Sequence, residues 1–248
     1  MQILLATSNP HKLDEIRSVF DGEPAADAVD WKLFTDLEPE YQYGLTEPVE
    51  DQPTFEGNAA LKARHYAKMT DRVCLADDSG IEVDHLNGAP GVISARYAGV
   101  RGPRTKVDPA NNVKLLQELT DVPIEKRTAR FVCTMCLIIP GHQRDKVPAA
   151  GYDRLVRPGD DFAQLIVRGT VEGRIILPSE VDDPRFPERG RGENGFGYDP
   201  LFVLPPGHDY AGLTTAELTP EQKNSISHRG AAARLLLAEM IEKGLISK

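Results

Sequence analysis

The sequence TSNPHK at residues 7–12 has the residue types of a phosphate-binding turn. It follows a short apolar run at residues 2–6, a predicted strand, and it precedes a helical pattern that begins at Pro10. A strand that leads into a helix through a tight polar turn presents free backbone N–H groups and the positive end of a helix dipole, which attract phosphate. Lys12 would add a cation there. A plain helix cap at Asn9 with a solvated Lys12 fits the same residues.

A pair of acids, Asp77 and Asp78, follows an apolar run at residues 73–76, which we expect to be a buried strand that stops at Asp77. Open α/β sheets bind ligands at this end of their strands. Adjacent carboxylates repel unless a cation lies near, and Mg²⁺ is the usual oxygen-seeking ion. One carboxylate could instead accept a proton from water. Side chains alternate along extended backbone, so both acids are not expected on one ion. The alternative is an Asp-Ser-Gly turn with solvated acids.

An aromatic residue between two glycines marks the sequence GFGYDP at residues 195–200. Glycine weakens helices and strands, so this pattern suggests a backbone that approaches a ligand closely. Phe196 or Tyr198 would then offer a ring on which a base can stack. An ordinary tight turn before a short strand at residues 201–204 is the alternative.

Cations gather near the C-terminal end of the sequence. Lys223 lies on a predicted short helix that begins at Thr219 with a capping box and a proline. His228 and Arg229 follow shortly after, and their side chains can donate hydrogen bonds to keto oxygens or phosphates. A solvated helix start explains the same residues without a ligand.

The motif CxxC at Cys133 and Cys136 is expected to be structural. It lies inside a predicted buried strand, where a spacing of three sends the two thiols to opposite faces. No second CxxC and no HExxH motif supplies further zinc ligands. We therefore expect two core cysteines.

Predicted helices and strands would position these motifs. A helix that begins at Thr54 carries Asn58 and Lys62 on one polar face, four residues apart. Its apolar stripe consists of Phe55, Ala59, Ala63, Tyr66 and Ala67. The remaining predictions are helices at residues 109–119 and 229–242, long strands at residues 127–139 and 162–176, and surface loops at residues 140–161 and 178–195. This order indicates an α/β fold with a mixed sheet.

Composition limits the classes of partner. The 248 residues carry 29 Lys and Arg against 38 Asp and Glu, a net charge of −9, which matches a long nucleic acid or an anionic membrane poorly. We expect no nucleic-acid partner and no membrane association, since no apolar run approaches the length of a membrane span. Three cysteines and no secretory pattern at the start favour a reducing compartment, the cytoplasm.

Five blocks, in this order along the chain, resemble the inosine triphosphate pyrophosphatase family. They are ATSNPHKLDEI, TFEGNAALKARHYAK, ADDSGIEVDHLNGAPGVISARYAG, GFGYDPLF and AELTPEQKNSISHRG. The resemblance implies an elongated mixed β-sheet with flanking helices, two lobes around a central nucleotide-binding cleft, and a homodimer. It implies Mg²⁺-dependent hydrolysis of non-standard purine triphosphates (ITP, dITP and XTP) to the monophosphate and pyrophosphate. The whole chain, residues 1–248, would be one such domain.

The resemblance also implies roles for individual residues. Asp78 would be the proton acceptor and, with Glu50, a metal ligand, and Ser79 would contact the substrate. The triphosphate would be bound by Thr7, Ser8, Asn9, Pro10, His11, Lys12 and Lys62. The nucleoside would be held by Phe196, Gly197, Tyr198 and Asp199. Base and phosphate recognition would be completed by Lys223, His228 and Arg229.

The chain departs from the family pattern in one stretch and leaves two alternatives open. About residues 140–194 form a longer connection than is usual before GFGYDP. The register of Glu50 is loose, because Glu40, Glu47 and Asp51 lie in the same acidic segment. The alternatives are a catalytically silent nucleotide-binding protein and a pyrophosphatase of different base specificity.

Overall fold

The computed structural model describes residues 1–7, 10–21, 26–38 and 44–247, with only the backbone described at Pro10, His11 and Ala26. The chain divides into two compact units. Unit 1 comprises Met1–Asp78, Cys133–Gly169 and Arg229–Lys248, and unit 2 comprises Ser79–Val132 and Thr170–His228.

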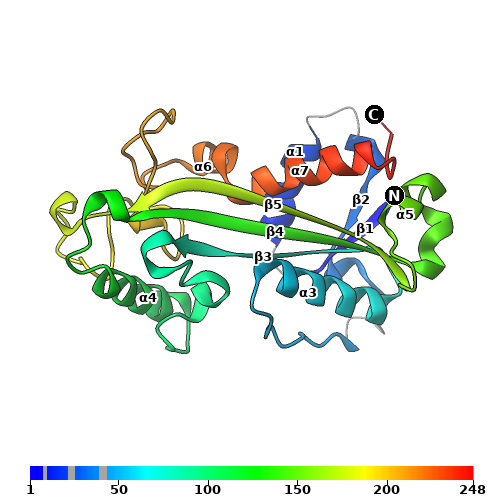
Figure 1. Cartoon of the computed structure of the whole chain (residues 1–248), viewed down its shortest axis with the longest axis horizontal. Helices are drawn as coiled ribbons and strands as arrows, with labels where there is room; N and C mark the ends of the chain where they lie inside the picture. The colour runs from blue at the N-terminus through cyan, green and yellow to red at the C-terminus, as the bar shows by residue number, and fades with distance from the viewer. Residues whose placement is uncertain (8–9, 22–25, 39–43, 248) are drawn as a thin grey trace. The chain divides into compact units, whose positions relative to one another are not determined.

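Six strands of the described chain form one mixed sheet, which confirms the predicted α/β fold (Figure 1). Their order is β2-β1-β3-β4-β5-β6. The bounds are β1 (Gln2–Leu5), β2 (Asp30–Lys32), β3 (Cys74–Val83), β4 (Thr128–Pro140), β5 (Phe162–Ile175) and β6 (Phe202–Val203). β1 runs parallel to β2 and β3, and β5 runs antiparallel to β6.

Unit 1 has helices on both faces of its part of the sheet. Helices α1 (Pro10–Phe20) and α7 (His228–Glu242) cover one face, and α3 (Phe55–Thr70) covers the other (Figure 1). Two separate cores result, because alternate residues of a strand face opposite sides. Cys133 packs in the α1/α7 core and Cys136 in the α3 core, so the prediction of two core cysteines is confirmed.

Unit 2 has one core of its own. The end of β3, strand β6 and helix α4 (Arg104–Glu118) contribute to it, for example through Ile81, Phe202 and Leu115. Helix α6 (Pro220–Ile226) begins with the predicted capping box, in which Thr219 and Gln222 exchange side-chain and backbone hydrogen bonds. None of the described helices is both long enough and apolar enough to cross a membrane.

The predicted helix at Thr54 is confirmed in detail. Thr54 is its N-cap and accepts the N–H of Gly57. All five residues of the predicted apolar stripe are buried in α3. The predicted helices at Pro10 and at residues 229–242 and the two predicted long strands are also present.

The prediction that strand β3 stops at Asp77 is wrong. The strand continues through Asp77–Gly80 to Val83. The acidic pair is therefore part of a buried strand and is no solvated turn, since Asp77 and Asp78 are 3% and 8% exposed. Partners for both carboxylates, described below, make this burial possible. Ile81 and Val83, both fully buried, continue the apolar alternation beyond the acids.

Two further predictions are wrong. Helix α4 starts at Arg104, five residues before the predicted start, and contains Pro109 in its interior. A proline inside a helix removes one hydrogen bond, but the buried side of α4 already includes Val107, so packing carries the helix across this position. The stretch predicted as a loop at residues 140–161 contains a helix, α5 (Ala149–Leu155), whose Tyr152 is buried in the unit 1 core.

Candidate active site

The carboxylate of Asp77 lies on the α1/α7 face of β3. Lys12 of α1 contacts its two oxygens at 2.8 and 3.1 Å, and Arg229 of α7 contacts Oδ2 at 3.3 Å. Arg229 also donates to Glu15 of α1 at 2.8 Å. Burial alone would raise the pKa of Asp77, but the charges of Lys12 and then Arg229 outweigh it and hold the pKa far below 3.8. Asp77 is therefore a permanently charged anchor for two cations.

The carboxylate of Asp78 lies on the opposite face, against α3. Asn58 donates to its Oδ2 at 3.0 Å, and Lys62 lies 3.7 Å from its Oδ1. Glu50 reaches the same Lys62 ammonium at 3.1 Å. The amide of Asn58 is held in this orientation because its oxygen accepts the N–H of Gln52 at 3.0 Å. The predicted polar face of α3 therefore delivers Asn58 and Lys62 to one carboxylate.

The two neighbouring acids differ in proton affinity. Burial raises the pKa of Asp78 above 3.8, and the charge of Lys62 and the hydrogen bond from Asn58 offset this only in part. A carboxylate with a raised pKa is a better proton acceptor than an ordinary one. Of the two acids, Asp78 has the properties of a general base.

The donor set around Lys62 suits a hard divalent cation. Two carboxylates, Asp78 and Glu50, already converge on one positive charge, and oxygen ligands of this kind are those that Mg²⁺ takes together with water and phosphate oxygens. Within the described ranges no group of three or more His, Cys, Asp or Glu side chains could hold a metal. A cation here would complete its coordination with oxygens of the substrate and water.

The sequence GFGYDP forms a tight loop in unit 2. Asp199 accepts the N–H of Phe196 at 2.7 Å and contacts Lys223 at 2.5 Å. Gly195 has φ +78°, and a Cβ there would lie 2.3 Å from Asp199 Oδ2, so glycine is required at this position. The ring of Phe196 is left 54% exposed.

The two aromatic residues predicted as stacking candidates differ in exposure. Tyr198 is 5% exposed and packs in the unit 2 core, where its hydroxyl donates to the carbonyl of Ser94 at 2.9 Å. Phe196 alone of the two has a ring that a base could reach.

The three predicted cations of the C-terminal region have different partners. Lys223 contacts Asp199, whereas Arg229 contacts Asp77 and Glu15. His228 stacks on Phe131 of β4 at 5.3 Å between ring centroids.

Part of the predicted phosphate-binding turn lies outside the described residues. Ser8 and Asn9 lie outside the described residues, and Pro10 and His11 are described only as the backbone of the first turn of α1. Thr7 follows the end of β1, and Ser79 lies in β3 directly after Asp78.

Sequence reasoning missed several residues around these motifs. Glu15, the partner of Arg229, gave no signal beyond its place on a polar helix face. Asp108 and Arg104, which contact the Phe196 loop, were hidden by the wrong start of α4, because both precede the predicted helix.

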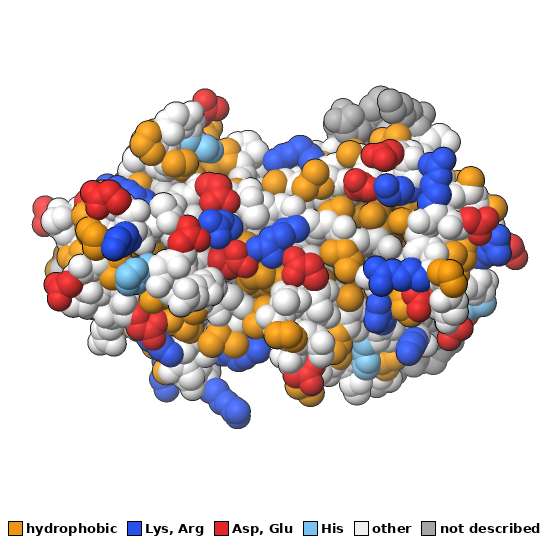
Figure 2. All heavy atoms as spheres, viewed as in Figure 1, with side chains coloured by type: hydrophobic (Ala, Val, Ile, Leu, Met, Phe, Trp, Pro, Cys, Tyr) orange, Lys and Arg blue, Asp and Glu red, His pale blue; other side chains and the backbone are white. Residues whose placement is uncertain are grey.

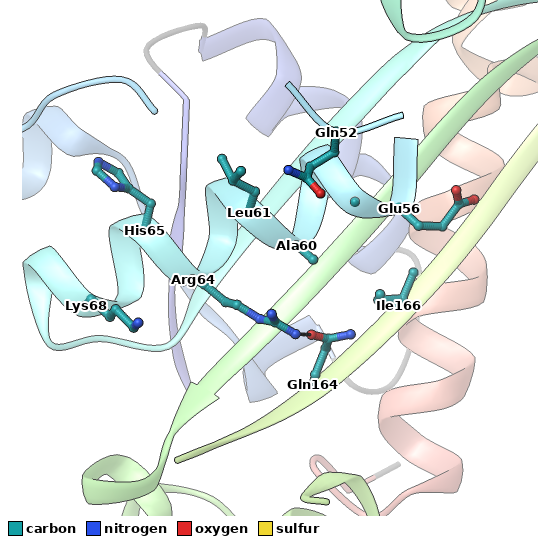
Figure 3. A pocket seen from close by; sticks show the side chains of 10 residues that line it. Gln52, Glu56, Ala60, Leu61, Arg64, His65, Lys68, Gln164 and Ile166 are labelled. Atoms are coloured by element: carbon teal, nitrogen blue, oxygen red, sulfur yellow. Dashed lines mark hydrogen bonds between the residues drawn. The ribbon is translucent and has the colours of Figure 1, made fainter. Parts of the chain in front are cut away.

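A hollow of about 640 Å³ lies elsewhere in unit 1, between α3 and β5 (Figure 3). Arg64 spans it and donates to Gln164, with Glu56 and Lys68 also in its wall. None of the residues that line it is a predicted site residue, and the pKa of Glu56, the carboxyl group in its wall, is lowered rather than raised. On the face drawn in Figure 2, charged side chains of both signs are interspersed, so surface charge does not identify a site on that face.

Comparison with known proteins supports the motif-based resemblance. The Ham1 family model matches residues 3–239. The dITP/XTP pyrophosphatase of Bifidobacterium animalis subsp. lactis is 41% identical, over 98% of this chain and 100% of that protein. The Ham1 protein of Staphylococcus aureus superposes with a TM-score of 0.69 at 33% identity, over 98% of this chain and 100% of that one. The nucleoside-triphosphatase or dITP/XTP pyrophosphatase of Mycobacterium abscessus gives 0.65 at 37% identity, over 96% and 97%. The chain belongs to the Ham1 family.

Proposed function

We propose that this chain hydrolyses non-standard purine nucleoside triphosphates, namely dITP, XTP and ITP, to the monophosphate and pyrophosphate. The observation that carries the proposal is the acidic pair on β3. Asp77 holds two cations on one face, and Asp78, with a raised pKa, lies beside Lys62 and Asn58 on the other. The name and 41% identity of the Bifidobacterium relative support the same activity.

Cations near β3 would hold the triphosphate. The whole protein is acidic, so a polyanionic substrate needs concentrated positive charge. Lys12 and Arg229 on one face and Lys62 on the other bring that charge to neighbouring positions of one strand. We assign the phosphate end of the substrate to these residues, together with the turn at residues 7–12.

Asp78 would act as the proton acceptor. It takes a proton from the water that attacks the α-phosphorus, and pyrophosphate leaves. Asn58 and Lys62 keep the carboxylate in place on its inner side. Asp78 and Glu50 would also hold a divalent metal, for which we propose Mg²⁺. The metal, when bound, neutralises charge on the phosphate oxygens.

The nucleoside end is assigned to unit 2. Phe196 offers its exposed ring to the purine, and Lys223 and His228 are donors for a six-keto oxygen. Adenine carries an amine at this position, and a donor that faces another donor costs about 1–3 kcal/mol. Ser79 would contact the sugar or phosphate.

A substrate panel tests the proposal. Purified protein with Mg²⁺ is assayed for pyrophosphate with dITP, XTP, ITP, dGTP, dATP and dTTP. We expect kcat/KM to be highest for the first three, and loss of activity with EDTA that added Mg²⁺ restores. Nucleotide binding without pyrophosphate release would support a silent nucleotide-binding protein. Preference for another base would support a pyrophosphatase of different specificity.

We further infer that the whole chain acts as one pyrophosphatase domain, with residues 140–194 as an insertion, and that it assembles as a homodimer in the cytoplasm. The family match over residues 3–239 supports a single domain. Three buried, free cysteines support a reducing compartment. Light scattering in solution tests the assembly, and a monomeric mass at working concentration would contradict it.

A further inference from the structure

Helix α4 contacts the loop that carries Phe196 at two points. Asp108 Oδ2 accepts the N–H of Gly197 at 2.8 Å. The guanidinium of Arg104, one helical turn earlier on the same face, lies 4.5 Å from the centre of the Phe196 ring. Both residues also line a cavity of about 490 Å³, to which Phe196 and Gly197 belong.

The loop needs such contacts because little else holds the ring. Phe196 is 54% exposed, so packing contributes little to its position. Gly197 has φ +60°, in the left-handed region, and a Cβ there would meet no atom within 4 Å. Asp199 secures one side of the loop through the N–H of Phe196. Asp108 secures the next peptide from outside the loop.

The two ends of this arrangement are well anchored. Asp199 accepts a hydrogen bond from Thr215 at 2.8 Å as well as contacting Lys223, and Lys223 itself lies 4.8 Å from the Phe196 ring. Asp108 is carried by a helix whose inner side is buried in the unit 2 core. The backbone of the loop that carries Phe196 is therefore held by two carboxylates that are themselves anchored.

We propose that Asp108 and Arg104 of α4 are positioning residues for Phe196 and set how tightly the protein holds the base of its nucleotide. Asp108 fixes the backbone under the ring, and Arg104 restrains the ring through a cation–π contact. The inference rests on the proposed function, in which Phe196 stacks on the purine. Neither residue touches the reacting phosphate in this scheme.

The test separates binding of the base from binding of the phosphates. KM and kcat for dITP, and Ki for inorganic tripolyphosphate, are measured for Asp108→Ala, Asp108→Asn and Arg104→Met. We expect Asp108→Ala to raise KM about tenfold, with kcat and the tripolyphosphate Ki within about twofold of wild type. Asp108→Asn keeps an oxygen acceptor and is expected to restore most of the affinity. Arg104→Met, an exposed change, is expected to raise KM about threefold.

Two controls sharpen the result. Lys106→Met removes an exposed cation from the same helix and should leave KM unchanged. In a Phe196→Ala background, Asp108→Ala should add little to KM, because it acts through the ring. If Asp108→Ala raised KM by the same factor in the Phe196→Ala background as in the wild type, that result would overturn the inference. So would an unchanged KM in Asp108→Ala, or a tripolyphosphate Ki that rises in parallel with KM.

The wild-type measurement distinguishes this inference from the proposed function. Wild-type protein that binds dITP but releases no pyrophosphate contradicts the proposed function alone, and the same comparison is then made with Kd in place of KM. Wild-type protein that binds no dITP contradicts both.

Discussion

Asp77 and Asp78 are neighbours in one strand, yet the protein treats them in opposite ways. Asp77 faces α1 and α7 and is contacted by Lys12 and Arg229. Asp78 faces α3, where an amide donates to it and the Lys62 ammonium lies at 3.7 Å. The pKa of the first falls and that of the second rises. The difference teaches that the alternation of a β-strand can place a structural anchor and a reactive group one residue apart.

The difference also defines what each acid can contribute. A buried carboxylate with two cations close to it holds both cations in place. Removal of the carboxylate leaves the cations with less compensating charge. A buried carboxylate with weaker neutralisation retains proton affinity and remains available for chemistry. The following substitutions should therefore affect stability on one face of β3 and turnover on the other.

The largest effect is expected from Asp78→Asn. The amide has the size of the acid but cannot accept the proton of the attacking water, so kcat for dITP should fall by about a thousandfold or more. At saturating Mg²⁺, nucleotide affinity should stay within a few-fold of wild type, as measured by titration calorimetry. Near-normal pyrophosphate release by this variant would contradict the assigned role of Asp78.

Asp77→Asn should act mainly on stability. It removes a charge partner of the partly exposed Lys12 and of the buried Arg229, which keeps its ion pair with Glu15, so the free energy of unfolding should fall by about 3 kcal/mol in urea titrations. Asp153→Asn is the matched control, because its ion pair with Arg144 is exposed and should contribute no more than about 1 kcal/mol. Equal losses of unfolding free energy in the two variants would contradict the role of Asp77 as a structural anchor.

Glu50→Gln should weaken metal binding. Loss of one of two carboxylates is expected to reduce Mg²⁺ affinity by about 10–100-fold, seen as a higher Mg²⁺ requirement in the assay and as weaker Mn²⁺ binding by electron paramagnetic resonance. Glu47→Gln, an exposed acid three residues earlier, is the control and should change neither. A larger effect of Glu47→Gln than of Glu50→Gln would indicate that Glu47 is the metal ligand.

The smallest effect is expected from Thr54→Ala. Loss of the N-cap of α3 should lower the free energy of unfolding by about 1 kcal/mol. Because α3 carries Asn58 and Lys62 to Asp78, KM for dITP should shift slightly at temperatures where the protein stays folded. A stability loss as large as that of Asp77→Asn would show that the two faces of β3 are not independent.

Local sequence signals determine several structural features of this protein. The cap at Thr54, the capping box at Thr219, the stripe of α3 and the opposite faces of Cys133 and Cys136 all follow from residue type and spacing. These features depend on neighbours within one or two turns, or on strand alternation, and both are written in the order of residues. The prediction that the two acids of β3 do not share one ion also follows from that alternation.

Tertiary structure decided the features that depend on partners distant in the sequence. The burial of Asp77 required Lys12 and Arg229, which lie 65 and 152 residues away, so a strand through two acids could not be inferred from the acids themselves. The burial of Tyr198 depended on a core that includes its hydrogen bond to Ser94, and the start of α4 depended on which side of the helix the core covers. Spacing determines which side chains share a face, whereas the free energy of burying a charge depends on what the rest of the chain brings to it.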